Sequence, residues 1–266
     1  EGMPETIDPE HYNSLLEVFE KSFSDYKDLP AFSNMGKTLS YDEIDTATKK
    51  VASYIQNNLG LKKGDKVAVM MPNLLQTPVT ILGILRAGCV VVNVNPLYTV
   101  RELEHQLKDS DTTAIFILAN FADTLEKSLA HTDVKHIVVT QVGDMVGGIK
   151  KHIVNFVVKY IKKMVPKFSL PNPIKFSDLL DADENAYKRP EMGLNDLAFL
   201  QYTGGTTGVS KGAMLSHGNM VGNLEQVSGC LDNVLVRGQE VVVTALPLYH
   251  IFALTANCLT FMKYGG

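Results

Sequence analysis

The feature of this sequence that most constrains its fold is a regular alternation of short β-branched runs and helical patterns. Residues 66–71 (KVAVMM) form an apolar run of the length of a buried strand, and residues 75–86 follow with a helical pattern. Residues 89–94 (CVVVNV) form the next apolar run. Two strands joined by a helix lie parallel in one sheet, because the helix returns the chain to the same end. The alternation therefore predicts an α/β fold with doubly wound, mostly parallel sheets.

Two capping boxes indicate where helices begin. Ser40 is followed three residues later by Glu43, and Thr99 in the same way by Glu102. In each pair the hydroxyl accepts from one unpaired backbone N–H, and the carboxylate reaches back to another. We expect the first helix to run to about Gly60, a residue type that commonly follows a helix C-terminus, and the second to about residue 108.

The alternation continues along the chain. Further strands are predicted at residues 113–118, 136–140, 197–202, 212–216 and 240–246, with helices near 121–129, 218–230 and 251–263. The stretch from Pro166 to Pro190 holds four prolines and several acids, so we place a boundary between two α/β subdomains there. The predicted division is residues 1–165 for the first subdomain, 166–196 for the linker and 197–266 for the start of the second.

Composition excludes several classes of protein. Lys and Arg number 25 and Asp and Glu number 29, so a net charge of −4 offers no basic excess for nucleic acid. The 45% of hydrophobic residues is typical of a chain with a sizeable core. Cys89, Cys230 and Cys258 are too few and too widely spaced for a disulfide framework or a zinc site. The acidic start, EGMPE, is unlike a signal peptide, and we expect a cytoplasmic protein.

Residues 241–262 are the one stretch long and apolar enough to suggest a membrane span. Pro247, His250, Asn257 and three threonines interrupt it. We therefore predict a buried strand, a turn and a core helix here, and no transmembrane helix.

The most informative segment for function runs from Tyr202 to Gly212, with the sequence YTGGTTGVSKG. Eight of its eleven residues are Gly, Thr or Lys, a density that argues against a surface loop with chance glycines. Glycines let several backbone N–H groups converge on one anion, threonine hydroxyls add donors, and Lys211 adds a positive charge. The segment also follows a predicted strand, where α/β sheets bind their ligands. It predicts a polyphosphate site.

Two common phosphate motifs do not fit this segment. The P-loop has Gly directly before Lys, where this chain has Ser210, and the spacing G-x-G-x-x-G is absent. The segment resembles instead the phosphate loop T-S-G-T-T-G-x-P-K-G of the adenylate-forming superfamily, which includes acyl-CoA synthetases, luciferases and peptide-synthetase adenylation domains. Gly204 replaces the serine of that pattern and Ser210 its proline. The first change removes a hydroxyl, and the second loosens the loop before Lys211.

Other stretches resemble bacterial long-chain fatty-acid–CoA ligases. They are residues 71–76 (MPNLLQ), 93–98 (NVNPLY), 101–107 (RELEHQL), 155–166 and 241–254. The resemblance covers nearly the whole chain but only the N-terminal half of such a ligase, so we expect a truncated chain. The family's adenine and ribose blocks, its Mg²⁺-binding glutamate and its mobile C-terminal lysine have no match here. We therefore expect this chain alone to form neither an acyl-adenylate nor a thioester.

The resemblance implies an ATP-dependent ligase that converts a fatty acid, ATP and CoA into acyl-CoA, AMP and pyrophosphate through an acyl-adenylate. It implies that the loop contacts the β- and γ-phosphates and stabilises charge at the α-phosphorus. It assigns catalytic roles to Lys211, Thr206 and His250, with Mg²⁺ held by a residue outside this chain. The residues that it assigns to ATP are Tyr202, Thr203, Gly204, Gly205, Thr206, Thr207, Gly208, Val209, Ser210, Lys211, Gly212 and Ala213.

The motif at residues 247–250 (PLYH) resembles the family's second block, which lies beside the carboxylate and the acyl chain. Tyr249, His250 and Phe252 are therefore candidate substrate residues. The alternative from the residues alone is a histidine satisfied in the core, with the two aromatic residues as ordinary core packing.

A basic amphipathic stretch runs from Lys150 to Lys167, with six lysines and no acid. On a helical wheel its lysines gather on one side and its apolar residues occupy the rest. One interpretation is a helix that lies on an anionic membrane surface, and the other is a core-packed helix with a solvated lysine face.

The expected partners are ATP, a long-chain fatty acid, CoA, an anionic membrane surface and a second copy in a homodimer, with no nucleic acid. Two other functions stay open at this point. One is a ligase of the same superfamily for an aryl, medium-chain or amino acid. The other is a non-catalytic module that binds acyl or phosphate ligands.

Overall fold

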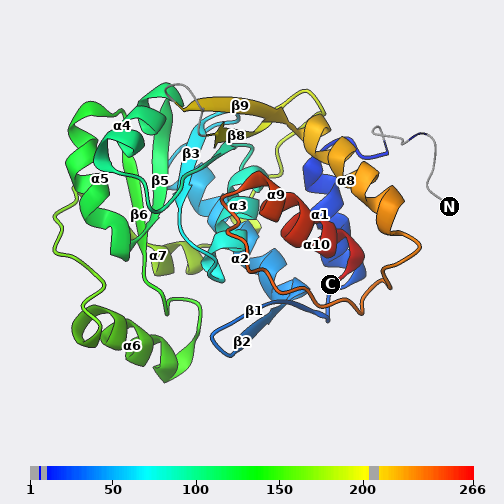
Figure 1. Cartoon of the computed structure of the whole chain (residues 1–266), viewed down its shortest axis with the longest axis horizontal. Helices are drawn as coiled ribbons and strands as arrows, with labels where there is room; N and C mark the ends of the chain where they lie inside the picture. The colour runs from blue at the N-terminus through cyan, green and yellow to red at the C-terminus, as the bar shows by residue number, and fades with distance from the viewer. Residues whose placement is uncertain (1–5, 7–10, 204–209) are drawn as a thin grey trace.

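One seven-stranded sheet organises the chain in the computed structural model, which describes residue 6, residues 11–203 and residues 210–266 (Figure 1). The strand order is β7-β6-β5-β3-β4-β8-β9. All neighbours are parallel except β8 and β9, which form an antiparallel hairpin at one edge. The strands are β3 (Lys66–Met70), β4 (Val90–Asn93), β5 (Thr112–Leu118), β6 (His136–Thr140), β7 (Ile174–Lys175), β8 (Leu197–Thr203) and β9 (Lys211–Ser216), with a separate hairpin of β1 (Pro30–Asn34) and β2 (Lys37–Ser40).

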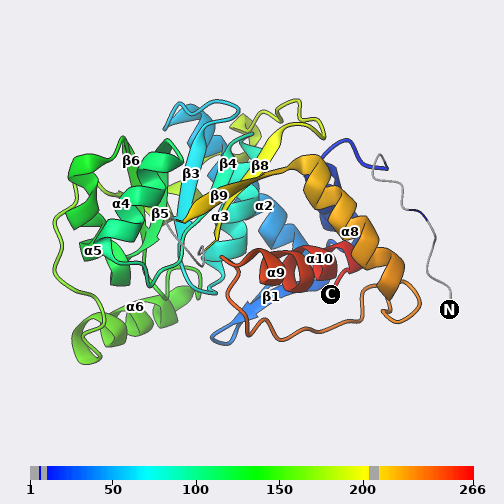
Figure 2. The same cartoon turned by 45° about the horizontal axis from the view of Figure 1, so that its top comes forward.

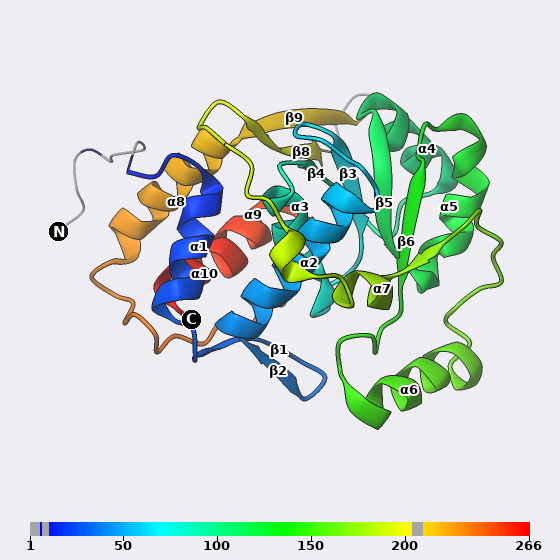
Figure 3. The same cartoon turned by 180° about the vertical axis from the view of Figure 1, so that it is seen from behind.

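Helices cover both faces of this sheet, as the predicted doubly wound α/β fold requires. Figure 3 shows α2 and α7 on one face, and Figure 1 shows α4 and α5 on the other. The helical segments are α1 (Leu15–Asp25), α2 (Tyr41–Asn57), α3 (Gln76–Arg86), α4 (Val100–Asp109), α5 (Ala122–Ser128), α6 (Gly148–Phe156), α7 (Phe176–Leu180), α8 (His217–Leu231), α9 (Ile251–Ala253) and α10 (Thr260–Tyr264), the 3-10 turns η1 (Ala119–Phe121), η2 (Leu129–His131) and η4 (Glu184–Ala186), and the π-helical turns η3 (Val157–Ile161) and η5 (Leu254–Leu259).

Side chains alternate along β3 between the two faces. Val67 and Val69 belong to the core under α2 and α3, whereas Ala68 and Met70 belong to the core under α4 and α5. A strand buried on both faces reads as a continuous apolar run, which is why residues 66–71 predicted it. No described helix is long and apolar enough to cross a membrane.

Both capping boxes are present. The hydroxyl of Ser40 accepts from the backbone N–H of Glu43 at 3.2 Å, and the carboxylate of Glu43 accepts from the Ser40 N–H at 2.8 Å. Thr99 and Glu102 repeat the arrangement at the start of α4. These bonds satisfy backbone groups that a helix leaves unpaired, so the helix starts were readable from the sequence.

The sheet runs unbroken across the predicted linker. β7 comes from residues 166–196 and pairs with β6, and β8 and β9 extend the same sheet beyond β4. The division of the chain into subdomains is therefore not marked by a break in the sheet, and it stays a proposal.

The prediction of a buried strand at residues 240–246 is wrong. This run forms no ladder among the described residues, and Val241 and Val243 are 92% and 83% exposed. A β-branched run becomes a strand only where another strand offers its backbone. The helical part of the prediction is confirmed, since α9, η5 and α10 run without a break from Ile251 to Tyr264 and pack in the core. Figure 2 shows them beside α8, and contacts join α10 to α1.

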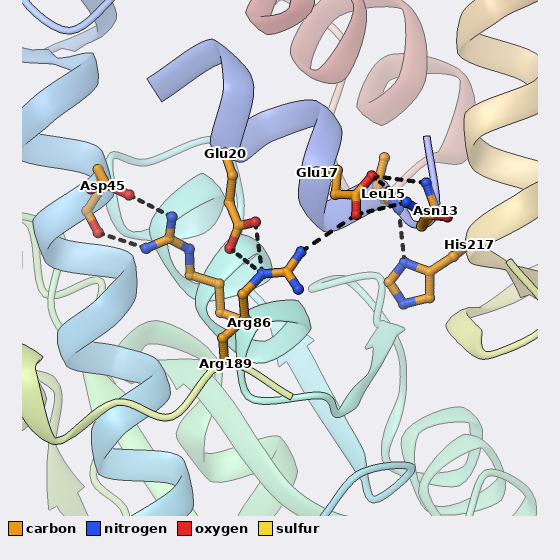
Figure 4. Close-up of polar contacts among 8 residues, drawn as sticks. All are labelled: Asn13, Leu15, Glu17, Glu20, Asp45, Arg86, Arg189 and His217. Carbon is orange, nitrogen blue, oxygen red and sulfur yellow. Dashed lines mark hydrogen bonds and ion pairs between the residues drawn. The ribbon is translucent and has the colours of Figure 1, made fainter. Parts of the chain in front are cut away.

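A buried ion pair ties α3 to α2 (Figure 4). The guanidinium of Arg86 donates to the carboxylate of Asp45. It also lies 5.1 Å from the centre of the Phe23 ring and 5.8 Å from that of Phe19, both on α1. Aromatic faces attract a cation, so one arginine holds three helices together.

His217, at the start of α8, contacts the start of α1 (Figure 4). Its Nδ1 accepts from the backbone N–H of Leu15 at 3.2 Å, and the ring is fully buried. Burial lowers the pKa of His217 to about 4. The neutral ring is therefore the form that this contact uses, because a protonated Nδ1 cannot accept.

Candidate functional site

The predicted phosphate segment joins the two strands of the β8–β9 hairpin. In this ladder Thr203 pairs with Lys211 and Tyr202 with Gly212. Lys211 and Thr203 are both exposed, so their side chains are available at the point where the loop leaves the sheet. The predicted ATP residues Gly204, Gly205, Thr206, Thr207, Gly208 and Val209 lie outside the described residues.

Hydrogen bonds fix the end of the loop. The hydroxyl of Ser210 donates to the carbonyl of Thr203 at 2.8 Å, across the hairpin. Nε2 of His105, on α4, lies 3.0 Å from the carbonyl oxygen of Ser210. A carbonyl can only accept, so Nε2 of His105 carries the hydrogen. Sequence reasoning gave His105 no role, although it falls in the 101–107 motif.

Tyr202 and Gly212 pack directly on each other. A Cβ atom on Gly212 would lie 2.9 Å from carbons of the Tyr202 ring, closer than van der Waals contact allows. The Tyr202 hydroxyl donates to the carboxylate of Asp109 at 2.6 Å, and burial together with this hydrogen bond raises the tyrosine pKa. The hydroxyl of this predicted ATP residue is thus committed to α4.

Gln201 connects the loop strand to the PLYH motif. Its Nε2 donates to the carbonyl of Tyr249 at 2.9 Å, and its Oε1 accepts from Nδ2 of Asn93 at 3.1 Å. Gln106 in turn donates to the carbonyl of Asn93 at 2.8 Å. These buried amides join the ends of β4 and β8 to residues 247–250.

Asn73 fixes the segment before that motif. Its Nδ2 donates to the carbonyls of Thr244 and Leu246, each at 2.9 Å, and its Oδ1 accepts from the N–H of Leu248 at 2.8 Å. Asn73 follows β3, Asn93 ends β4, and Gln201 lies near the end of β8. The carboxyl ends of parallel strands are the edge at which open α/β sheets bind ligands.

The core alternative for the PLYH region is wrong for its outer residues. His250 is exposed, and Phe252 is 67% exposed. Tyr249 is half-buried, and its ring centre lies 4.5 Å from that of His250. The roles of these three residues toward a substrate stay predictions. Among residues 6, 11–203 and 210–266, no group of three or more His, Cys, Asp or Glu side chains is placed to hold a metal ion.

Known proteins match the chain along nearly its whole length. The family described as AMP-binding enzyme matches residues 19–266. A long-chain-fatty-acid–CoA ligase of Escherichia coli O6:H1 is 57% identical over 265 residues, which are 99% of this chain and 47% of that protein. The corresponding ligase of Haemophilus influenzae is 48% identical over 267 residues, again 99% of this chain and 48% of that protein. The chain thus spans about half the length of the curated relatives it matches.

Solved structures show the same fold. A long-chain-fatty-acid-CoA ligase from Archaeoglobus fulgidus superposes with a TM-score of 0.75 at 24% identity, over 99% of this chain and 47% of that one. A structure described as ATP-bound MatB from Rhodopseudomonas palustris superposes with a TM-score of 0.74 at 25% identity, over 96% and 44%.

Proposed function

The chain belongs to the AMP-binding enzyme family, and from that premise we propose that it supplies the phosphate-binding part of an ATP-dependent long-chain-fatty-acid–CoA ligase. The reaction joins a fatty acid to CoA through an acyl-adenylate, with release of pyrophosphate and AMP. One observation carries the proposal: the β8–β9 ladder places Lys211 opposite Thr203 at the carboxyl edge of the sheet, on either side of a loop of glycines and threonines.

We assign to Lys211 the binding of the negatively charged polyphosphate. This lysine takes part in no ion pair among the described residues, so its ammonium group is available to an anion. Attack of a carboxylate on the α-phosphate moves negative charge onto the leaving pyrophosphate. A fixed cation and fixed N–H donors stabilise that charge without having to reorganise. Thr203 and Thr206 would add hydroxyl donors.

Tyr249 and His250 would contact the second substrate, the fatty acid. The Gln201–Tyr249 bond holds their turn against the strand that carries the loop. The fatty carboxylate and the phosphates must meet at one point, so this bond supports a common site. Exposure of His250 leaves its ring available to a carboxylate. We place the Mg²⁺ ligand and the CoA contacts outside this chain, and we propose that the chain alone completes neither step.

The long chain of the acid is proposed on the strength of the relatives' names. The test is to incubate the whole protein with ATP, Mg²⁺ and CoA, supply palmitate, octanoate, benzoate or an amino acid, and identify the products by mass spectrometry. We expect palmitoyl-CoA and AMP as the main products. Preference for one of the other acids would contradict the proposed substrate, and ligand binding without any product would favour the non-catalytic module.

We also propose that the basic stretch contacts an anionic membrane surface, which would make a cytoplasmic protein peripheral. No residue of α6 or η3 is fully buried, which supports a helix at the surface over a core-packed one. Exposed apolar residues fall at helical spacing along one side, namely Ile149 (77% exposed), Ile153 (57%), Phe156 (56%) and Tyr160 (59%), while Ile161 (62%) ends the helix off this side and Met164 (58%) lies beyond it. An apolar stripe flanked by lysines is the pattern of helices that lie in the headgroup region. The homodimer stays a proposal that sedimentation of the whole protein would test.

A further inference from the structure

A cleft of about 580 Å³ lies between the α6–η3 helix and the β6–β7 edge of the sheet. Figure 3 shows α6 set apart from the body of the sheet, beneath β6 and α7. Among the described residues, its lining includes none of the PLYH motif and none of residues 202, 203 and 210–212. Its volume falls in the range of pockets that hold one small organic molecule.

The wall of the cleft is held by Asn155. Its Oδ1 accepts from the N–H of Gly143 at 2.7 Å, and its Nδ2 donates to Asp144 at 3.0 Å. Asp144 also accepts from the N–H of Gln141 at 2.7 Å and from the hydroxyl of Thr140 at 3.0 Å. These bonds attach the helix to the end of β6, so the cleft does not depend on a ligand to form.

The lining carries an excess of positive charge. The lining includes three lysines, Lys151, Lys159 and Lys175, and a single carboxylate, that of Asp144. This carboxylate already accepts three hydrogen bonds. In the described part of the chain these three lysines form no ion pair. An anion is therefore the ligand charge that the cleft favours.

Six of the ten other lining residues are apolar or aromatic, and the remaining four are Gln141, His152, Asn155 and Ser177. Phe156 and Tyr160 lie with ring centres 5.2 Å apart, and Phe168 and Ile174 also line the cleft. Aromatic surface beside several cations fits a molecule with an apolar chain and an anionic end, whereas a small inorganic anion would leave the rings exposed.

We propose that this cleft binds one long-chain fatty-acid anion, with its carboxylate toward the three lysines and its chain along Phe156, Tyr160 and Phe168. The choice of a fatty acid over another anionic amphiphile rests on the proposed function. Phe156 and Tyr160 belong both to the cleft lining and to the exposed apolar stripe of α6 and η3. A fatty acid that leaves a membrane bound at this stripe would therefore reach the cleft directly.

A photoreactive palmitate analogue tests the proposal on the whole protein. After irradiation and digestion, mass spectrometry should locate the label in peptides that contain Phe156, Tyr160 or Phe168, and excess palmitate should remove it. Hexadecanol at the same concentration should not. The combined variant Lys151→Gln, Lys159→Gln, Lys175→Gln should reduce labelling about tenfold, the loss expected for about 1.4 kcal/mol of charge interaction.

The matched control is Lys162→Gln with Lys163→Gln, which changes two lysines of the same stretch outside the cleft lining. Equal loss of labelling in the control would overturn the proposal, because general attraction to the basic stretch would then explain it. Label found only elsewhere would overturn it too, as would displacement by phosphatidylglycerol vesicles as effective as displacement by palmitate. Labelling is read without turnover, so retained labelling together with absent palmitoyl-CoA synthesis would contradict the proposed function and support the cleft.

Discussion

The side-chain amide of Gln201 donates a hydrogen bond of 2.9 Å to the backbone carbonyl of Tyr249. It joins the strand that carries the phosphate loop to the turn that carries His250. Gln201 is 6% exposed, so little water competes for this bond. The strand that leads into the phosphate loop and the turn of the PLYH motif are therefore joined in one packed unit.

Replacing Gln201 by Leu should destabilise this unit. The variant leaves the Tyr249 carbonyl and the Asn93 amide without their partner, which costs about 1–3 kcal/mol of unfolding free energy. Denaturant unfolding measures the loss. Gln239→Leu is the control, because Gln239 is exposed, and it should change the free energy by less than about 0.5 kcal/mol. An equal free energy of unfolding in the two variants would contradict the structural role of Gln201.

Replacing Gly212 by Ala should displace the Tyr202 ring, since the new Cβ would lie 2.9 Å from it. Overpacking of this kind costs about 1–3 kcal/mol. Gly193→Ala is the control, because its Cβ would meet only Asp196 at 3.9 Å. In a Tyr202→Leu background the cost at Gly212 should shrink, and an unchanged cost in this double-mutant cycle would refute the proposed contact.

His217 should make stability depend on pH. Its folded pKa of about 4 lies below the ordinary value of 6.5, so between these values the unfolded chain binds more protons. Stability should be fully present above pH 6.5 and fall by up to about 3 kcal/mol as pH drops toward 4. His136 contributes in the same direction, because burial also lowers its pKa.

His217→Gln should flatten part of this slope, since the amide can accept from Leu15 without titrating. The matched control is His152→Gln, which replaces an exposed imidazole by the same amide. Thermal unfolding from pH 4 to pH 8 measures the slope, and a slope in His217→Gln equal to that of the parent would rule His217 out.

Replacing Ile153 and Phe156 by Ser should weaken attachment to vesicles without loss of stability, because both side chains are more than half exposed. Burial of each in the headgroup region contributes on the order of 1–2 kcal/mol, so the pair should lower binding at least tenfold. Co-sedimentation with phosphatidylglycerol vesicles measures this, with phosphatidylcholine for comparison. Leu97→Ser, at 79% exposure, is the control on another surface. Vesicle binding that is unchanged when Ile153 and Phe156 are both replaced by Ser would refute membrane contact through α6.

Local signals account for the parts of the fold that the sequence predicted. The strand at 66–71 and the helix starts at Ser40 and Thr99 depend on residues within a few positions of one another. The strand expected at 240–246 depends on a partner strand, which a local pattern does not specify. Its carbonyls are held instead by Asn73, which lies 171 and 173 positions earlier.

The candidate site divides in the same way. Lys211 and the glycine–threonine loop were readable because a phosphate loop concentrates its donors in one segment. The supporting contacts of Asn73, His105 and Gln201 were not assigned, since each joins positions far apart in the chain. For Asn73 and His105 the available signal was their place in the resembling stretches 71–76 and 101–107.

The most direct test of the central claim is palmitate-dependent exchange of labelled pyrophosphate into ATP, measured on the whole protein and on its Lys211→Gln variant. We expect exchange in the parent and a loss of about 100-fold to 1,000-fold in the variant, the range for removal of one stabilising group from a developing charge. Lys108→Gln, an exposed lysine of α4, should exchange at the parental rate. Exchange by Lys211→Gln at the parental rate, or no palmitate-dependent exchange in the parent, would contradict the account.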